Sequence, residues 1–206
     1  MSSDIKLYNM DCMEAMKQMP DKSFDLAIVD PPYGIGDALV NGGTWSVKYQ
    51  AKGAKWDVAP TKEYFDELKR VSTNYIIWGA NYYPEHIGKS RGFIVWQKPY
   101  MDGMHTMGNC ELAFTSFDCN ARSIPINRAT ENRIHVTQKP IALYRWLLKN
   151  YAKEGNKILD THLGSGSIAI ACYDMGFDLT GYEIDKEYFD AAVKRLDNHK
   201  KQLTFI

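Results

Sequence analysis

Short apolar runs alternate along the chain with segments in which apolar residues recur every three or four positions. The runs have the length and composition of buried strands, and the recurring spacing is typical of helices that pack one face on a core. This alternation predicts an α/β fold with a largely parallel sheet. The expected strands cover residues 5–9, 24–29, 75–78, 93–96, 111–117, 157–159 and 179–183.

Helical spacing and polar insertions fill the rest of the chain. The expected helices cover residues 12–19, 61–71, 137–151, 167–175 and 185–200. Thr61, Thr137 and Asp185 stand where N-caps are expected, because their side chains can accept hydrogen bonds from the first helical N–H groups. Residues 34–60 and 118–135 are expected to be loop-rich insertions in a single domain.

The composition is that of a soluble globular protein and limits the function only loosely. The 206 residues are 45% hydrophobic and 24% charged, which suits one domain whose core needs no disulfides. The four cysteines have no metal-ligand spacing, so we expect reduced thiols, no metal and a cytoplasmic protein. No apolar run reaches membrane-spanning length. The formal net charge is zero, so binding to nucleic acid requires a local basic surface.

A glycine-rich turn follows the apolar run at 157–159. In ILDTHLGSGS, Gly164 and Gly166 let the backbone approach a ligand, and the helix that follows offers unpaired N–H groups. Glu183 ends the next expected strand, where an acid is placed to hydrogen-bond a ribose diol. The turn alone is often only a tight connection, but with this acid it predicts nucleoside binding. Ala169 replaces the third glycine of a dinucleotide fingerprint, which disfavours NAD.

The turn Asp30-Pro31-Pro32-Tyr33 directly follows the apolar run FDLAIV. Two prolines stiffen it and remove two N–H donors, so its carbonyl groups are expected to stay free as acceptors. The Asp30 carboxylate and the Pro31 carbonyl can together accept both hydrogens of an exocyclic amine and aim its lone pair at an activated methyl group. Tyr33 is suited to stacking on an extruded base. A lone Asp-Pro is more often a solvated turn, so the interpretation depends on the neighbouring glycine site.

Together these motifs resemble the amino-methyltransferases of the β permutation class, which modify adenine N6 or cytosine N4 in DNA. The resemblance runs through LYNMDCMEAM, FDLAIVDPPYG, NYIIWGANYY, FIVWQKP, ELAFTSF, HVTQKP, LDTHLGSGS and GYEID. In that family the catalytic turn precedes the cofactor glycines, as it does here. The resemblance implies one Rossmann-like methyltransferase domain, a seven-stranded sheet with circularly permuted motif order, the cofactor S-adenosylmethionine, and chain ends that lie near each other.

The resemblance also implies roles for individual residues. The catalytic turn would comprise Asp30, Pro31, Pro32 and Tyr33. The cofactor-binding residues would be Asp11, Cys12, Thr137, Lys139, Asp160, His162, Gly164, Ser165, Gly166 and Glu183. Within this set, Asp11 and Cys12 match the position that contacts the cofactor adenine, whereas Thr137 and Lys139 match the segment that closes over its methionine end.

Two positions depart from the family pattern. His162 stands where the family usually has phenylalanine, and we interpret it as a packing residue rather than an acid or base. Val136 replaces a usual proline. Neither departure touches the catalytic turn.

Two basic segments are candidates for contact with double-stranded DNA. Three lysines in the first insertion recur at helical spacing among aromatic residues, a pattern suited to phosphates, although a solvated lysine face looks the same. Three arginines lie in the second insertion, the counterpart of the family's target-recognition region. The candidates are Lys48, Lys52, Lys55, Arg122, Arg128 and Arg133. Because the second insertion is short, we expect a brief recognition site or added surface from a second subunit, as in a homodimer.

We predict methyl transfer to adenine N6 in DNA, as in restriction–modification systems or phages, because an aspartate leads the Pro-Pro-Tyr turn. Cytosine N4 is the nearest alternative, since family members with that activity more often carry serine there. Structured RNA is a further alternative, and protein glutamine is disfavoured by Asp30 and by the motif order. An inactive nucleic-acid-binding homologue would be a different class, which the filled catalytic positions disfavour.

Overall fold

The computed structural model describes residues 3–35, 57–98, 108–128, 133–135 and 137–203. Within them, eight strands form one sheet in the order β1-β8-β7-β2-β3-β5-β4-β6. The strands are β1 (Ile5–Tyr8), β2 (Phe24–Val29), β3 (Ser72–Trp78), β4 (Phe93–Gln97), β5 (Cys110–Thr115), β6 (Arg122–Pro125), β7 (Lys157–Asp160) and β8 (Asp178–Tyr182). The helices are α1 (Cys12–Met16), α4 (Lys62–Val71), α5 (Pro84–Ile87), α6 (Ile141–Tyr151), α7 (Ser167–Met175) and α8 (Lys186–Leu203), with a 3-10 helix, η1 (Ala80–Tyr82).

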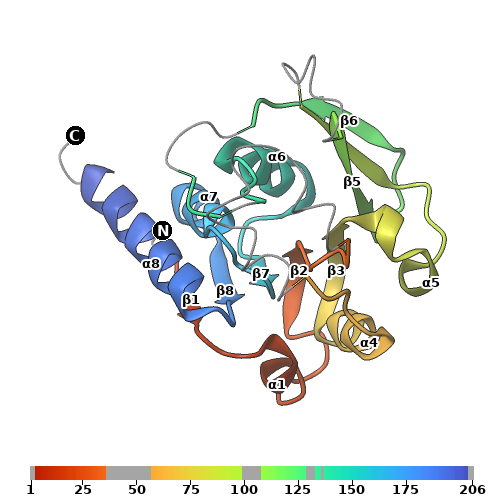
Figure 1. Ribbon diagram of the computed structural model, residues 1–206, viewed down its shortest axis with the longest axis horizontal. Coiled ribbons are helices and arrows are strands. Elements are labelled where there is room, and N and C mark those ends of the chain that lie inside the picture. The colour runs from red at the N-terminus through yellow and green to blue at the C-terminus, as the bar shows by residue number, and fades with distance from the viewer. Residues whose placement is uncertain (1–2, 36–56, 99–107, 129–132, 136, 204–206) are drawn as a thin grey trace.

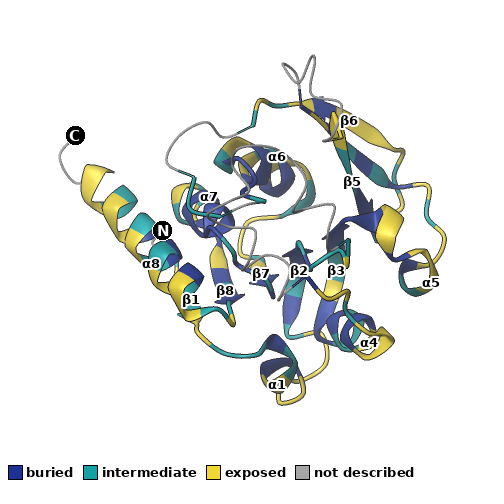
Figure 2. Cartoon of the chain, viewed as in Figure 1, coloured by how far each residue is buried: buried dark blue, intermediate teal, exposed yellow. Residues whose placement is uncertain are grey.

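The sheet lies between two layers of helices (Figure 1). Helices α6, α7 and α8 cover one face, whereas α1, α4 and α5 cover the other. Strand β2 shows why: Leu26 and Ile28 belong to the first apolar cluster, and Ala27 and Val29 to the second, because successive side chains of a strand alternate between faces. Both faces are covered, so this strand is almost continuously apolar and buried (Figure 2).

The proline turn, the glycine turn and Glu183 lie at the same edge of the sheet. Strands β1, β8, β7, β2 and β3 run parallel, so their carboxyl ends meet at the same edge. Strand β5 is antiparallel to both β3 and β4, and β6 is parallel to β4. Ligands in α/β sheets bind beyond the carboxyl ends of the parallel strands. The proline turn follows β2, the glycine turn follows β7 and Glu183 follows β8.

The predicted α/β fold with a mostly parallel sheet is confirmed, but the expected number of seven strands is wrong for the described residues. The additional strand is β6, which lies inside the segment predicted as a loop. Its sequence, RSIP, is short, and only Ile124 is buried, so no alternating pattern marks it. Pairing with β4, from Ile94 with Arg122 to Gln97 with Pro125, makes it a strand.

The three expected helix caps have different outcomes. Thr61 stands at the N-cap of α4, but its side chain makes no capping hydrogen bond. Thr137 lies outside α6, and the prediction that it caps this helix is wrong, because Pro140 disfavours helical geometry in the residue before it. Asp185 is confirmed as a cap, since its Oδ1 accepts two N–H groups of the first turn of α8, at 2.9 and 3.1 Å.

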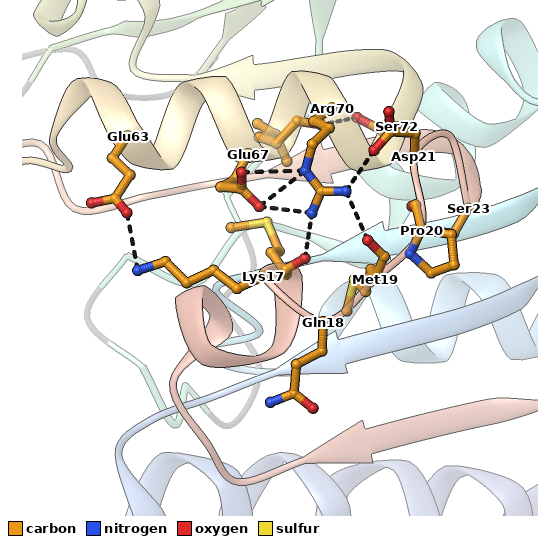
Figure 3. Close-up of polar contacts among 12 residues, drawn as sticks. Lys17, Gln18, Met19, Pro20, Asp21, Ser23, Glu63, Glu67, Arg70 and Ser72 are labelled. Carbon is orange, nitrogen blue, oxygen red and sulfur yellow. Dashed lines mark hydrogen bonds and ion pairs between the residues drawn. The ribbon is translucent and has the colours of Figure 1, made fainter.

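Arg70 in α4 fixes the segment that leads into β2 (Figure 3). Its guanidinium donates to the carbonyl oxygens of Met16 and Met19, at 2.6 and 2.7 Å, and to the carboxylates of Glu67 and Asp21, both at 2.7 Å. The Met16 carbonyl also accepts the N–H of Met19 at 3.0 Å, so Arg70 adds a second donor to the turn that follows α1. The bonds of Arg70 tie α1 to α4 and so hold the start of the strand that delivers the proline turn.

Tyr173 in α7 contacts residues close to both described ends of the chain. The Ser3 hydroxyl lies 3.5 Å from the Tyr173 carbonyl oxygen, and the Lys200 ammonium lies 5.2 Å from the centre of the Tyr173 ring. Residues close to both described ends therefore contact the same residue of α7, whereas the expected proximity of the chain ends themselves stays a prediction. In the part of the chain that the structure describes, none of the helices combines the length and the apolar character that crossing a membrane requires.

Candidate active site

A cavity of about 250 Å³ opens beyond the carboxyl ends of β2, β7 and β8. The proline turn from Asp30 to Tyr33 forms one part of its wall. The glycine turn from Leu163 to Ser165, together with Glu183, forms another. The two motifs therefore line the same cavity. Of the other expected cofactor residues, Thr137, Lys139 and His162 also line this cavity.

Four expected cofactor residues are not among those lining the cavity. Asp11 caps α1 by accepting a backbone N–H at 2.7 Å, and Cys12 is buried, which raises the pKa of its thiol to about 12. Asp160 is buried at the end of β7. Gly166 has φ +69°, and a Cβ built on it would lie 3.1 Å from the Cβ of Ala192, so this glycine allows α8 to pack closely.

The sequence predicted that the carbonyl groups of the proline turn would be free. The structure shows that they already accept a hydrogen bond. The buried Tyr83 hydroxyl lies 3.0 Å from the carbonyl oxygen of Pro31 and 2.5 Å from that of Pro32. A carbonyl oxygen has two lone pairs, so the Pro31 oxygen keeps one position for a further donor. Tyr83 thus fixes the direction in which these carbonyls point.

The Tyr33 side chain is held on three sides. Its hydroxyl donates to Oδ1 of Asp30 at 2.7 Å, and its ring stacks on Tyr82 with centres 4.9 Å apart and planes 18° apart. A Cβ built on Gly79 would lie 2.4 Å from the Tyr33 ring, so only glycine fits beneath it. Burial, and next the Asp30 charge, raise the pKa of Tyr33 well above its usual value, so the hydroxyl stays protonated and remains a donor.

Four charged side chains, two buried and two partly buried, connect the cavity to the sheet. The Lys139 ammonium pairs with Oδ2 of Asp30 and lies 3.1 Å from Oε2 of Glu111. The Lys98 ammonium lies 2.5 Å from Oε1 of Glu111. Burial raises the pKa of Asp30, and the positive charge of Lys139 opposes this. Burial alone would also raise the pKa of Glu111, but Lys139 and Lys98 lower it to about 2.

Glu183 holds the glycine turn in place. Its Oε2 accepts the N–H of Gly164 at 2.8 Å, and its Oε1 accepts the N–H of Asp185 at 2.9 Å. Each carboxylate oxygen keeps a second acceptor position. Next to it, Ile184 lines the cavity with 67% of its surface exposed. An apolar side chain exposed in a cavity wall suits contact with a flat ring.

Several residues that shape this site were not predicted from the sequence. Tyr83, Glu111 and Lys98 carried no local signal, and their contacts with the site join segments far apart in the sequence. Asp57 lines the cavity and accepts the N–H of Gly34 at 3.0 Å. Ile184 could have been predicted from the sequence. It is an apolar residue that directly follows the acid in GYEID, beyond the end of the strand, where no further strand would bury it.

The structure describes three of the six DNA-binding candidates. Lys48, Lys52 and Lys55 lie outside the described residues. Arg122 begins β6, which runs in the same direction as β2, so it lies at the edge of the sheet opposite the cavity and donates to Asn150 at 2.8 Å. The structure thus separates Arg122 from the site. Arg128 and Arg133 are half-buried, and burial, followed by the charge of Arg128, lowers the pKa of Arg133.

Asp160 predicts a measurable dependence of stability on pH. Burial raises its pKa to about 8, whereas the unfolded chain loses this proton near pH 4. The folded protein therefore binds the extra proton, and its free energy of unfolding falls by about 1.4 kcal/mol between pH 7 and pH 9 as that proton is lost. Asp160→Asn cannot ionise, so urea unfolding at the two pH values should show this loss in the wild-type protein and not in the variant. Equal losses in both would assign the effect to another group.

Among the residues described, no group of histidine, cysteine and acidic side chains is arranged to hold a metal ion. The acidic residues of the cavity are instead hydrogen-bonded to backbone N–H groups or paired with Lys139. The site therefore offers carboxylate acceptors, a glycine-lined wall and aromatic rings.

Comparison with known proteins agrees with this geometry. The sequence model of the N6/N4 methyltransferase family, described as DNA methylase, matches residues 95–194. The type II methyltransferase M.HpaI of Haemophilus parainfluenzae is 26% identical over 244 aligned positions, which cover 95% of this chain and 75% of that protein. The type II methyltransferase M.ScaI of Streptomyces caespitosus is 23% identical, with coverage of 98% and 84%.

Solved structures share the fold. The M1.HpyAVI–SAM complex has a TM-score of 0.62 at 22% identity, covering 94% of this chain and 99% of that one. The cytosine-N4-specific PvuII DNA methyltransferase has a TM-score of 0.66 at 11% identity, covering 98% and 93%. The chain is thus similar to the N6/N4 DNA methylase family, both in sequence and in fold.

Proposed function

We propose that the protein is an S-adenosylmethionine-dependent DNA methyltransferase that methylates the N6 amine of adenine at an extruded base. One observation carries the proposal: the Asp30 turn and the glycine turn line the same cavity. Similarity to the DNA methylase family supports DNA as the substrate. The aspartate at the head of the turn favours adenine N6 over cytosine N4, which stays the alternative.

The residues around the glycine turn fit the cofactor. Gly164 has φ +52°, a conformation that other residues adopt only with strain, so the backbone there can approach a ligand closely. The spare acceptor positions of Glu183 suit two ribose hydroxyls, and Ile184 suits the adenine ring. When bound, S-adenosylmethionine supplies a methyl group on a positively charged sulfonium, whose carbon takes the nitrogen lone pair while the C–S bonding pair goes to sulfur.

The proline turn would prepare the amine. An exocyclic amine is a weak nucleophile because its lone pair is delocalised into the ring. If the Asp30 carboxylate and the second lone pair of the Pro31 carbonyl each accept one amine hydrogen, the nitrogen lone pair leaves the ring plane. After transfer the nitrogen carries one excess proton, which passes to the Asp30 carboxylate and on to water. Tyr33 would stack on the base.

The site is reached only by a base that has left the duplex, which costs a few kcal/mol of stacking and pairing. We infer that Arg128 and Arg133, which precede the cavity residues of the same segment, contact the phosphates, and that a second subunit adds DNA-binding surface.

The chain order supports a circular permutation, because the catalytic turn after β2 precedes the glycine turn after β7.

Sequencing of single DNA molecules that the protein has modified tests the proposal. The chain is expressed in cells that lack endogenous methyltransferases, and the expected result is N6-methyladenine at one short motif. N4-methylcytosine at such a motif would keep the enzyme class and replace the substrate. DNA that carries no modification, from cells containing folded protein, would overturn the proposal.

His162 is expected to act by packing. Its ring lies edge-on to Tyr64 with centres 5.4 Å apart, and burial lowers its pKa to about 4, so it is uncharged at neutral pH. His162→Ala removes a ring from the cavity wall and should weaken S-adenosylmethionine binding roughly tenfold. His162→Phe should restore most of that affinity, as measured by calorimetry. If phenylalanine binds as weakly as alanine, the imidazole has a polar role.

A further inference from the structure

Both oxygens of the Asp30 carboxylate already have partners. Oδ1 accepts the Tyr33 hydroxyl at 2.7 Å, and Oδ2 accepts the Lys139 ammonium. The Lys139 side chain is 1% exposed and that of Asp30 is 14% exposed, so water screens this pair only weakly. The lysine that the resemblance assigned to the cofactor thus touches the catalytic carboxylate.

Glu111 keeps Lys139 from turning away. Its Oε2 lies 3.1 Å from the Lys139 ammonium, and its Oε1 is paired with Lys98, whose side chain is 5% exposed. The four groups alternate in sign, with Asp30 at the cavity and Lys98 at the end of β4. A buried charge that loses its partner is costly, so each member fixes the next.

We propose that Lys139 is a positioning residue for methyl transfer: anchored by Glu111, its ammonium keeps the Asp30 carboxylate ionised and oriented to accept the hydrogens of the target amine. This inference rests on the proposed function and assigns a role within the same site. Each carboxylate oxygen accepts two hydrogen bonds, so an amine can bind Asp30 while Lys139 and Tyr33 stay in place.

The charges around Asp30 make its ionisation depend on Lys139. Burial raises the pKa of Asp30, Lys139 lowers it, and Glu111 raises it. The other titratable groups that sense the Asp30 charge are Tyr33, Tyr83, Tyr144 and Asp160, none of which is positively charged. Without Lys139, Asp30 would hold a proton at higher pH, and a protonated carboxyl loses acceptor capacity.

The pH profile of turnover by the full chain on DNA tests this. In Lys139→Met, the acidic limb should move up by at least about one pH unit, with turnover at pH 7 roughly tenfold or more below wild type and largely recovered at pH 9. Lys139→Arg keeps the charge, so its limb should stay within about half a unit of wild type. If Lys139→Met does not fold, as judged by circular dichroism, Lys139→Gln takes its place with the same expected shift.

Glu111→Gln separates this role from a structural one. It removes a negative charge that raises the pKa of Asp30, so its acidic limb should stay or move down, opposite to Lys139→Met. An unchanged limb in the uncharged Lys139 variants, at whatever activity, overturns the inference. The inference is also overturned if the uncharged Lys139 variants bind S-adenosylmethionine more than about tenfold more weakly while their turnover is unchanged, since Lys139 would then serve the cofactor. If wild-type protein methylates no DNA at any pH, the proposed function itself fails.

Discussion

Asp30→Asn is expected to lower methyl transfer by roughly a thousandfold or more while S-adenosylmethionine binding changes by no more than about threefold. The amide keeps the shape of the carboxyl group but removes its charge and one acceptor oxygen, so it cannot hold the amine as proposed. Asp30 lies in the proline turn, and its carboxylate is bonded to Tyr33 and Lys139. The glycine turn is held by Glu183 instead, so cofactor affinity should survive. Incorporation of labelled methyl groups into DNA and calorimetry of cofactor binding measure the two effects.

Asparagine is a better test than alanine because of Lys139. Alanine would leave the Lys139 ammonium buried with Glu111 as its remaining partner, and breaking a buried ion pair typically costs 3–5 kcal/mol of stability, so roughly that loss is expected for Asp30→Ala. Asparagine keeps a carbonyl oxygen that the ammonium can contact. Loss of activity in a folded Asp30→Asn protein can therefore be assigned to the chemistry.

Asp57→Asn is the matched control, because it makes the same change of carboxylate to amide in the same cavity. Asp57 accepts the N–H of Gly34 at 3.0 Å, a bond that the amide oxygen can also accept, so we expect a loss of at most about tenfold. Similar losses in the two variants would mean that negative charge in the cavity, rather than Asp30, is what matters. Retention of more than about a tenth of wild-type turnover in Asp30→Asn would exclude Asp30 as the essential acceptor.

The parts of the site that the sequence predicted are those encoded by neighbouring residues. An apolar run followed by Asp-Pro-Pro-Tyr specifies both a buried strand and a rigid turn at its end, and the glycine turn and Glu183 are marked in the same local way. Parallel strands then bring these ends to one edge of the sheet, so the shared cavity followed from the fold class.

The parts that the sequence did not predict depend on contacts between distant segments. Glu111 lies near the start of one apolar run and Lys98 just after another, and nothing in the local pattern shows that the two form an ion pair. Antiparallel pairing of β4 with β5 brings them together, and Lys139 arrives from a third segment. Strand β6 was missed for the same reason, because pairing rather than pattern defines it.

Glu183→Ala is expected to weaken S-adenosylmethionine binding by roughly a hundredfold. Hydrogen bonds to a charged carboxylate typically contribute about 1.5–3 kcal/mol each. Two ribose hydroxyls at the lower end of this range contribute about 3 kcal/mol, which corresponds to roughly a hundredfold in affinity because about 1.4 kcal/mol is a factor of ten. The structure adds a second cause, because Glu183 also anchors the N–H groups of Gly164 and Asp185. Calorimetry gives the affinity, and steady-state kinetics give the Michaelis constant for the cofactor.

Turnover at saturating cofactor separates binding from catalysis in this variant. Glu183 is placed to contact the ribose and not the reacting nitrogen, so its loss should raise the Michaelis constant and leave maximal turnover within about fivefold of wild type. Glu183→Asp keeps the charge, but its shorter side chain cannot bridge Gly164 and Asp185, so an intermediate affinity is expected. If Glu183→Ala instead lowered maximal turnover at unchanged affinity, while Asp30→Asn weakened cofactor binding, the two walls of the cavity would have to exchange their assigned roles.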